Sequence, residues 1–440
     1  MTEHKSAAQP VTLLVRGGRL VDGNGLDRVA DVAIAGDVIA AIGPGLTAGP
    51  GAAVVDAAGL FVLPGLCDMH VHLREPGEED KETVATGVAA AVAGGFTDVA
   101  CMPNTQPALD DQSRVRFVRE RAQAAGLARV HVIAAVTQGR EGTQLTEMAD
   151  LRAAGAVGFS DDGAPVRNAE LMRRALEYGK MVGAPIIDHC EDRELAANGV
   201  MNEGRVATEL GLLGIPAAAE DVMVARDLLL AEMTGAHVHI AHLSTRGGVE
   251  LVRQAKARGV HVTAEVTPHH LVLTDEAVRR YDPNTKMNPP LRTSADVLAL
   301  RAGLKDGTID AIASDHAPHT DHEKELEFDQ APFGVVGLET AFSLMLTELV
   351  DKGVIDLPGL VRAMSLAPRR ILRLPGGVLA PAAPADLTLV DPEARWQVDP
   401  ARFRSKARNT PFAGFRLRGE VVATIAGGRQ VFARAVAGVR

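Results

Sequence analysis

Short apolar runs alternate with amphipathic stretches through the middle of the chain, roughly from Leu63 to Leu374. Short runs of this kind are typical of strands buried in a parallel sheet, and the intervening stretches have the periodicity of helices. Such alternation predicts parallel βαβ units, and eight units predict an α/β fold of the (β/α)8 barrel type. The expected strands are Leu60–His72, Thr97–Met102, Val130–Val136, Ala156–Ser160, Pro185–His189, Val238–His242, Val260–Glu265 and Ile309–Ser314, and the clearest helices are Ser113–Ala125 and Asp221–Thr234.

The two ends of the chain follow a different pattern, in which β-forming residues alternate with Gly-rich turns. Val11–Asp56 is typical of short hairpins, and the same pattern returns in Ala385–Pro392 and Gly419–Ala433. These segments predict one small β-sandwich-like domain assembled from both termini. We expect residues 1–62 and 375–440 to form this composite domain, and residues 63–374 to form the barrel.

The first expected barrel strand leads into a possible metal-binding motif. Leu60–Cys67 carries no charge, and Asp68, His70 and His72 follow it directly. Residues two apart in a strand point to the same face, about 6.6 Å apart along the chain. Two imidazoles at that spacing can reach one metal ion, because Zn–N bonds are about 2.0–2.1 Å long. A single His-x-His pair is weak evidence, since such pairs also occur as hydrogen-bonded structural groups.

Further polar residues stand where the other expected strands end. In a (β/α)8 barrel these carboxyl ends meet at one face, and that face carries the chemistry. At least four histidines and two aspartates at one rim are too many polar groups for a structural core, because each unpaired buried group is costly. The pattern therefore predicts a metal centre. The residues at these strand ends are His70, His72, Asn104, Asp161, Asp162, His189, His242, Asn288, Asp315, His316 and His319.

Composition narrows the class of protein. The 440 residues are 46% apolar and 23% charged, which is ordinary for a globular enzyme. With 46 basic and 56 acidic residues the net charge is −10, which argues against nucleic acid as a partner. Three cysteines, Cys67, Cys101 and Cys190, predict a reduced chain without disulfides. The N-terminal segment does not have the pattern of a signal peptide, and the uncharged run Val38–Val55 is broken by prolines, so we expect a cytoplasmic protein with no membrane segment.

Eight motifs in order along the chain resemble one enzyme family. PGLCDMHVHLREPG, MPNTQP, FSDDG, IIDHCED, HIAHLST, NPPLR, ASDHAPH and FGVVGLET together resemble the amidohydrolase superfamily, and within it the type I dihydroorotases. The resemblance runs through nearly the whole chain, including the divided β domain. It implies reversible, zinc-dependent cyclisation of N-carbamoyl-L-aspartate to (S)-dihydroorotate in pyrimidine biosynthesis.

The resemblance also implies a set of metal ligands. Two zinc ions per chain are expected, bridged by Asp162 and a hydroxide, and Asp315 is expected to move the proton as well as to bind metal. The wider superfamily uses a carboxylated lysine as the bridge, but the nearest lysine here, Lys180, falls in a helix; Asp161 is the alternative bridge that spacing leaves open. The implied ligands are His70, His72 and Asp315 for one ion and His189 and His242 for the other.

The substrate contacts that the resemblance implies come from four loops. Arg74, Asn104, Asn288 and His319 would bind the substrate carboxylate and ring amide groups, and Phe333 and Gly334 would add backbone contacts. Arginine suits a carboxylate because its planar fork binds both oxygens. The chain is also expected to form a homo-oligomer, a dimer, and possible association with aspartate transcarbamoylase is part of the same resemblance.

Two other functions remain open from the sequence. A related cyclic amidase, a hydantoinase or allantoinase, is disfavoured by Arg74 and by the absence of the bridging lysine. A catalytically silent scaffold for aspartate transcarbamoylase is disfavoured because all six ligand positions are filled. Cys190 could serve as a thiolate ligand, although a buried neutral thiol is favoured because it points away from His189. The remaining strand-associated histidines, His237, His239, His261, His269 and His270, are expected to be structural.

Overall fold

Eight parallel strands form the barrel in a computed structural model that describes residues 10–434. The expectations for residues 1–9 and 435–440 lie outside the described residues. The last strand meets the first through a bridge between Val71 and His316, where His72 N donates to His316 O at 2.8 Å. The predicted barrel is thereby confirmed. Its strands are β6 (Leu66–Val71), β7 (Phe96–Cys101), β8 (Arg129–Ala134), β9 (Ala156–Phe159), β10 (Ile186–Asp188), β13 (Val238–Ile240), β14 (Val262–Val266) and β15 (Ala311–Ile312).

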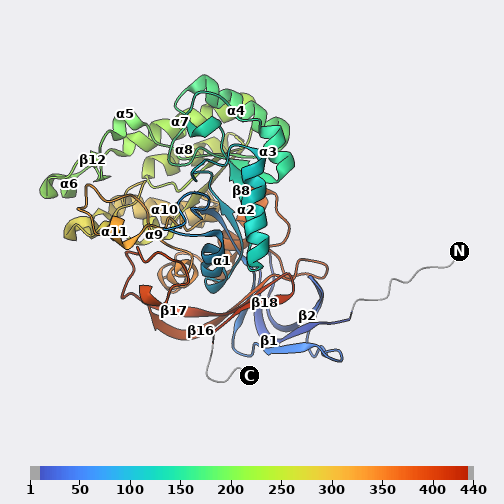
Figure 1. Ribbon diagram of the computed structural model, residues 1–440. Helices are drawn as coiled ribbons and strands as arrows, with labels where there is room; N and C mark the ends of the chain where they lie inside the picture. The colour runs from blue at the N-terminus through green and yellow to red at the C-terminus, as the bar shows by residue number, and fades with distance from the viewer. Residues whose placement is uncertain (1–9, 435–440) are drawn as a thin grey trace.

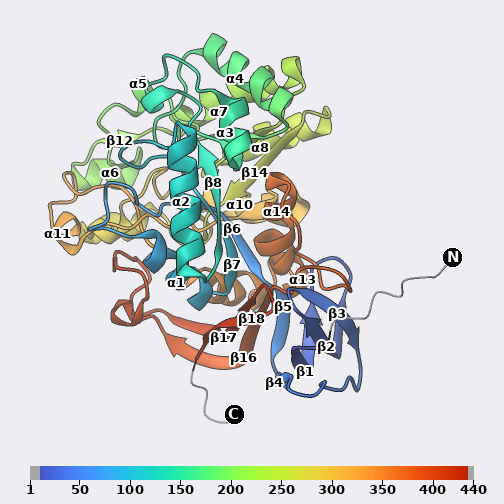
Figure 2. The ribbon, with the colours of Figure 1, turned by 45° about the vertical axis from the view of Figure 1, so that its right-hand side comes forward.

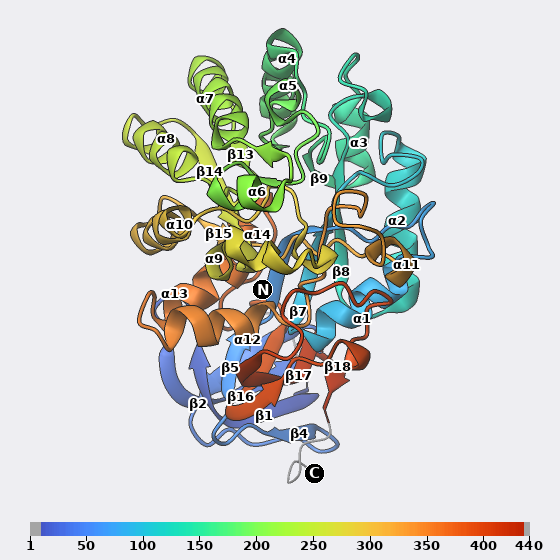
Figure 3. The same cartoon turned by 90° about the vertical axis from the view of Figure 1, so that its left-hand side faces the viewer.

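Helices surround these strands on the outside (Figure 3). The Asp111 side chain caps the second helix by accepting from the backbone N–H groups of Ser113 and Arg114, and Gly126 ends it in the left-handed region at φ 65°. Across residues 10–434 no helix is long and apolar enough to cross a membrane. The main helices are α1 (Val84–Ala93), α2 (Gln112–Ala125), α3 (Met148–Ala154), α4 (Ala169–Val182), α7 (Ala217–Thr234), α8 (Arg246–Ala257) and α10 (Ser294–Asp306).

Shorter elements fill the loops and the end of the barrel. Those in the loops are η1 (Gln138–Arg140), α5 (Arg193–Ala196), β11 (Met201–Asn202), α6 (Arg205–Leu210), β12 (Gly214–Ile215), α9 (Pro268–Val272), η2 (Asp275–Arg280), η3 (Pro283–Thr285) and α11 (Asp321–Lys324). After the last barrel strand come α12 (Ala341–Met345), η4 (Leu346–Val350), α13 (Leu357–Val361), η5 (Arg362–Leu366) and α14 (Ala367–Leu372).

A second sheet combines strands from both ends of the chain and lies below the barrel in Figures 1 and 2. Its order is β18-β17-β16-β5-β1-β2-β3, with β4 added beside β1. The two halves meet where Leu387 pairs with Pro64 and Val390 with Phe61. The predicted β domain from both termini is confirmed. Its strands are β1 (Leu13–Val21), β2 (Asp27–Ala35), β3 (Val38–Gly43), β4 (Ala53–Asp56), β5 (Phe61–Pro64), β16 (Leu387–Gln397), β17 (Arg416–Ala426) and β18 (Arg429–Ala433), with η6 (Pro400–Arg402) between.

The expectation of one buried strand from Leu60 onward is wrong, because the chain changes sheets at Gly65. Residues Phe61–Pro64 belong to the terminal sheet, and the barrel begins at Leu66. A Cβ at Gly65 would lie 2.3 Å from Thr97 Oγ1, so only glycine fits. A continuous apolar run indicates that a segment is buried, but it does not indicate which sheet the segment belongs to. The sequence therefore predicted one strand where the structure has two, β5 and β6.

A buried charge cluster joins the two sheets beneath this glycine. Arg369, only 1% exposed, donates to Asp98 Oδ2 at 2.5 Å and to Gly65 O at 2.8 Å. Arg129 binds the same aspartate through Nε at 2.8 Å and reaches Asp386, next to β16, through Nη1 at 3.1 Å. The base of the barrel is therefore held to the terminal sheet by paired rather than isolated charges.

Candidate metal centre and substrate cavity

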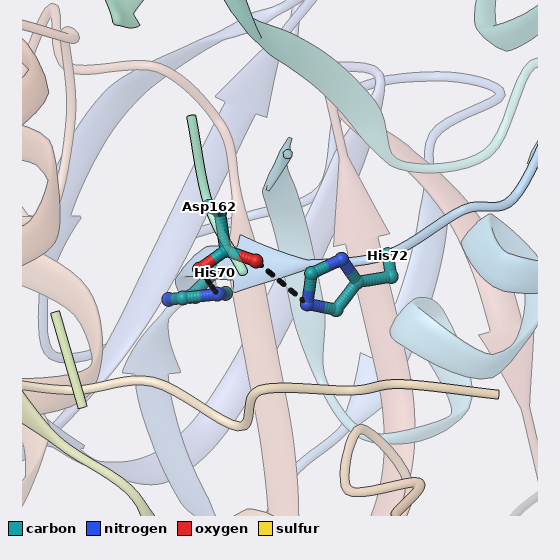
Figure 4. A group of neighbouring side chains, drawn as sticks. All are labelled: His70, His72 and Asp162. Atoms are coloured by element: carbon teal, nitrogen blue, oxygen red, sulfur yellow. Dashed lines mark ion pairs between the residues drawn. The ribbon is translucent and has the colours of Figure 1, made fainter. Parts of the chain in front are cut away.

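His70, His72 and Asp162 converge at the carboxyl ends of β6 and β9 (Figure 4). The Nε2 atom of His70 lies 3.4 Å from Asp162 Oδ1, and the Nε2 atom of His72 lies 3.7 Å from Asp162 Oδ2. Both imidazoles come from one strand end, as their spacing of two residues requires. The carboxylate stands between the two rings, so one ion could contact all three groups.

A second group shares Asp162 and adds His189 and His242, from the ends of β10 and β13. His242 Nε2 lies 3.6 Å and His189 Nδ1 3.8 Å from the same oxygen, Asp162 Oδ1. The facing ring nitrogens of the two histidines are 2.9 Å apart. Asp162 is thus common to both groups, which is the arrangement that a bridging carboxylate requires.

Asp315 lies beside the first group, just after β15. Its Oδ1 atom lies 3.0 Å from His72 Nε2 and 3.6 Å from His70 Nε2. Its backbone is in the left-handed region at φ 49°, as are Arg74 at 62° and His242 at 31°. Such conformations cost about 1–3 kcal/mol each and persist where the surroundings impose them. Three such residues at one end of the barrel indicate that the surrounding structure holds these side chains in place at the expense of a strained backbone conformation.

The donor set fits metal ions. Within residues 10–434, the buried atoms His70 Nε2 and Asp162 Oδ1, which face each other across 3.4 Å, have no hydrogen-bond partner. His189 Nε2 and His242 Nδ1 also have none, on rings whose other nitrogen faces Asp162. Buried polar atoms are normally paired, so a concentration of unpaired ones in one place points to a missing ligand. Imidazole nitrogens together with carboxylate oxygens are the donors that zinc accepts.

The charges of the cluster balance one another. Burial alone lowers the pKa of His70, but the carboxylates of Asp162 and Glu265 outweigh burial and raise this pKa well above its ordinary value. Burial raises the pKa of Asp162, yet the charge of His70 and the nearby imidazole of His242 hold it well below its ordinary value. Burial and the charge of His242 lower the pKa of His189 to about 4, so this imidazole is neutral and keeps a lone pair for a metal.

Glu265 on β14 orients His70, and the sequence analysis missed this role. Its Oε1 atom accepts from His70 Nδ1 at 2.6 Å, and its Oε2 atom lies 3.2 Å from His239 Nε2. A carboxylate behind a metal-binding imidazole fixes the ring tautomer and raises its basicity. The available signal was a glutamate within the strand VTAEV, and the structure buries it completely.

The neighbouring residues that were weighed as ligands lie outside both groups. Asp161 Oδ1 accepts from the backbone N–H groups of Val136 at 2.8 Å and Thr137 at 3.0 Å, so its carboxylate supports a loop. Lys180 lies on α4 and donates to Thr234 O at 2.8 Å. Burial, with the nearby charges of Asp188 and Asp227, raises the pKa of the Cys190 thiol well above its ordinary value, and the thiol is therefore neutral.

A cavity of about 230 Å³ opens beside the cluster. Every residue expected to contact substrate lines it, together with most of the expected ligands. It also includes Gly163 and Ala317, which the sequence analysis did not single out. The predicted residues that line it are His72, Arg74, Asn104, Asp162, His189, His242, Asn288, Asp315, His319, Phe333 and Gly334.

Arg74 is fixed at one end of this cavity, with 8% of its surface exposed. Its Nε atom donates to Pro318 O at 3.1 Å, and its Nη2 atom lies 3.3 Å from His319 Nε2. His319 Nε2 in turn donates to Phe333 O at 2.8 Å. Burial and the charge of Arg74 lower the pKa of His319 to about 3, so the ring is neutral and the guanidinium supplies the positive charge at this end.

Two loops that carry cavity residues are held together by buried lysines, which the sequence did not reveal. Lys324 donates to Pro283 O at 3.0 Å and to Pro332 O at 2.8 Å. Lys286 lies 4.7 Å from the centre of the Phe333 ring, and its carbonyl accepts from Gly334 N at 2.9 Å. These contacts fix the position of Phe333 and Gly334 in the cavity wall.

Comparisons with known proteins agree with this geometry. A family model described as Dihydro-orotase-like matches residues 59–248. The chain is 57% identical over 420 residues to a dihydroorotase from Pelotomaculum thermopropionicum, covering 95% of this chain and 98% of that one. It is 53% identical over 423 residues to a dihydroorotase from Geobacter sp. (strain M21), covering 96% and 99%. Among solved structures, an L-hydantoinase (dihydropyrimidinase) from Arthrobacter aurescens superposes with a TM-score of 0.86 at 27% identity, covering 98% of both chains.

Proposed function

The chain belongs to the dihydroorotase family of cyclic amide hydrolases, and on this basis we propose that it interconverts N-carbamoyl-L-aspartate and (S)-dihydroorotate in pyrimidine biosynthesis. One observation carries the choice of substrate. Arg74, a buried guanidinium, lines the same small cavity as Asp162, His189, His242 and Asp315. A cyclic amide that bears a carboxylate is complementary to both ends of this cavity.

We propose that the centre holds two zinc ions with Asp162 between them. His70, His72 and Asp315 would bind one ion, and His189 and His242 the other. The support is the pair of residue groups that share Asp162, together with their unpaired buried atoms. When bound, the ions would lower the pKa of a water molecule toward neutrality and polarise the attacked carbonyl.

Asp315 is proposed to move the proton. Burial raises its pKa, but the hydrogen bond from His72 and the charge of His70 outweigh burial, so its pKa lies below the ordinary value and the carboxylate is ionised near neutral pH. In hydrolysis it would accept a proton from the attacking water and release it to the ring nitrogen when the C–N bond breaks. In cyclisation the same proton would travel in the opposite direction.

Arg74, Asn104 and His319 are proposed to hold the substrate carboxylate, so that the ring carbonyl faces Asp162 and Asp315. Asn104 is oriented for this task because His72 Nδ1 lies 2.8 Å from its Oδ1 atom, which leaves its amide N–H groups free. Asn288, Phe333 and Gly334 would contact the ring from the other wall. Orientation of this kind lowers the barrier by bringing the reacting atoms into line before reaction.

The proposal extends to the state of the protein in the cell. We propose a cytoplasmic homodimer that can also associate with aspartate transcarbamoylase, as the resemblance to type I dihydroorotases implies. Size-exclusion chromatography with and without that partner tests both associations. Activity of the isolated protein would reject the silent-scaffold function.

Metal analysis combined with assays in both directions tests the central proposal. The purified protein, supplied with zinc, should hydrolyse dihydroorotate and cyclise N-carbamoyl-L-aspartate. Dihydrouracil and hydantoin, which lack the carboxylate, should be poor substrates. Faster hydrolysis of hydantoin than of dihydroorotate would favour the hydantoinase function instead.

A further inference from the structure

The Asn288 side chain is held by one end only. Its Nδ2 atom donates to Glu191 Oε2 at 2.8 Å. Its Oδ1 atom is buried and has no hydrogen-bond partner within residues 10–434, although Asn288 lines the cavity. An ionised carboxylate can only accept hydrogen bonds, so the nitrogen end of the amide must face Glu191. The unpaired end in the cavity wall is therefore a hydrogen-bond acceptor.

The opposite polarity is found at Asn104. When His72 binds a metal through Nε2, the nitrogen 3.0 Å from Asp315, its ring proton is on Nδ1, which then donates to Asn104 Oδ1 at 2.8 Å. Asn104 thus offers its N–H groups, which suit a carboxylate held by Arg74. The cavity presents donors at the Arg74 end and an acceptor at Asn288, and each polarity is imposed by a neighbouring side chain.

We propose that Glu191 is a positioning residue that sets substrate specificity by holding the Asn288 oxygen toward a ring N–H group of the substrate. This inference rests on the proposed function and names a residue that does not touch the substrate. The ureido part of the dihydroorotate ring carries N–H donors. An Asn288 oxygen that faces the cavity can accept a hydrogen bond from one of them. An Asn288 nitrogen in the same place would leave that donor unpaired. An unpaired buried donor is costly, so orientation of one amide discriminates between rings.

Glu191 also lies near His189, and its charge opposes the lowering of the His189 pKa by burial. A role through the metal ligand is therefore the competing explanation. The two roles predict different kinetics. Loss of a substrate hydrogen bond present before and during reaction raises KM and leaves kcat nearly unchanged, whereas a disturbed metal ligand lowers kcat and zinc content.

A double-mutant cycle on the zinc-loaded enzyme tests the inference. Glu191→Ala frees the Asn288 amide and should raise KM for dihydroorotate about 3- to 10-fold, the range for one neutral hydrogen bond. Asn288→Ala should do the same, and the double variant should be no worse than Asn288→Ala alone. Glu191→Gln should restore most of the loss, because its amide oxygen accepts the same hydrogen bond. Glu194→Ala, on the neighbouring helix with its side chain 87% exposed, is the matched control.

Two outcomes would overturn the inference. If the KM effects of Glu191→Ala and Asn288→Ala multiply in the double variant, Glu191 does not act through Asn288. If Glu191→Ala loses zinc and kcat instead, it acts through His189. Should the wild-type enzyme fail to hydrolyse dihydroorotate, the proposed function fails separately, and the cycle is run on whichever of dihydrouracil and hydantoin it hydrolyses, since both rings carry ureido N–H groups.

Discussion

The Nδ1 atom of His70 lies 2.6 Å from Oε1 of Glu265, and this contact leaves Nε2 of His70 directed at Asp162. Glu265 comes from β14, which β15 separates from β6 around the closed barrel, so the contact joins two strands that are not neighbours in the sheet. The ring therefore cannot rotate or change tautomer without breaking a buried, charged hydrogen bond.

Replacement of Glu265 by glutamine should weaken metal binding. The amide keeps the size of the side chain but loses the charge that makes His70 a stronger base, so zinc affinity should fall about 10- to 100-fold. Competition with a chromogenic chelator measures the change. The exposed Glu250→Gln on α8 serves as the control and should leave affinity unchanged. Equal affinities for both variants and the wild type would show that Glu265 does not act on the metal.

His189→Ala should reduce the zinc content from about two ions to about one per chain and abolish most activity, because one of only two imidazoles of the second group is removed. Elemental analysis after dialysis against zinc buffer gives the count. His261→Ala, which removes a ring stacked 4.2 Å from His237 outside the cluster, should retain both ions. Two ions in the His189 variant would remove this residue from the site.

Arg74→Lys should lower kcat/KM for dihydroorotate about 10- to 100-fold, the range for loss of one charged hydrogen bond, although the positive charge is kept. The same variant should discriminate less between dihydroorotate and dihydrouracil. Steady-state kinetics on both rings provide the measurement. If activity on dihydrouracil falls by the same factor, Arg74 acts on structure rather than on the carboxylate.

Asp315→Asn should keep zinc while kcat falls by at least about 10²- to 10⁴-fold, the usual contribution of general acid–base catalysis. In the wild-type enzyme, hydrolysis needs the ionised carboxylate and its rate should rise with pH to a plateau. Cyclisation starts from the protonated partner and should slow over the same range. Near wild-type rates in both directions with both ions retained would move the proton shuttle to His316 or His319.

Asp98→Asn should lower the free energy of unfolding by about 3–5 kcal/mol, because it leaves the buried Arg369 uncompensated. Burial raises the pKa of Asp98, but the charge of Arg369 and a hydrogen bond from His131 hold it well below 3.8. The stabilisation is therefore complete above pH of about 4 and is lost as the pH falls below it. Urea unfolding measured from pH 7 to pH 3 should show that the difference in the free energy of unfolding between Asp98→Asn and the wild type becomes smaller.

The half-exposed ion pair of Asp27 and Arg19 serves as a control for the buried pair of Asp98 and Arg369. Asp27→Asn should cost less than about 1 kcal/mol at any pH, as exposed ion pairs do. A cost for Asp98→Asn as small as this would mean that the cluster beneath Gly65 does not hold the two sheets together.

Much of the fold could be predicted, because buried parallel strands appear in the sequence as short apolar runs and the polar residues of the site follow directly after these runs. The spacing of His70 and His72 was weak evidence by itself, and it gained weight from the rim position of His189 and His242, which followed from the expected strand ends. The expected eighth strand, Ile309–Ser314, is only Ala311–Ile312, because the backbone there leaves regular pairing and closes the barrel through His316 instead. Strand ends depend on such tertiary pairing, which local pattern does not encode.

Orientation could not be predicted. Nothing local to Glu265, Glu191 or Lys324 says which side chain lies opposite, since each contact joins residues from different loops or strands. Gly65 illustrates the same limit for the fold, because its need for a small residue comes from Thr97 on the next strand. The sequence predicted which residues gather at the cavity, whereas the residues that orient them could be identified only from the structure.

The pairing of β5 with β16 has a consequence for how the protein is made. At about 5–20 residues per second, the ribosome would release β16 roughly 16–65 s after β5. Throughout that interval the edge of β5 that pairs with Leu387–Val390 is open on the nascent chain, and every strand of the barrel emerges before β16 does. We expect the barrel to assemble first and the terminal sheet to close last. A chain released before residue 387 would keep an unpaired apolar edge, which favours association with other unfinished chains.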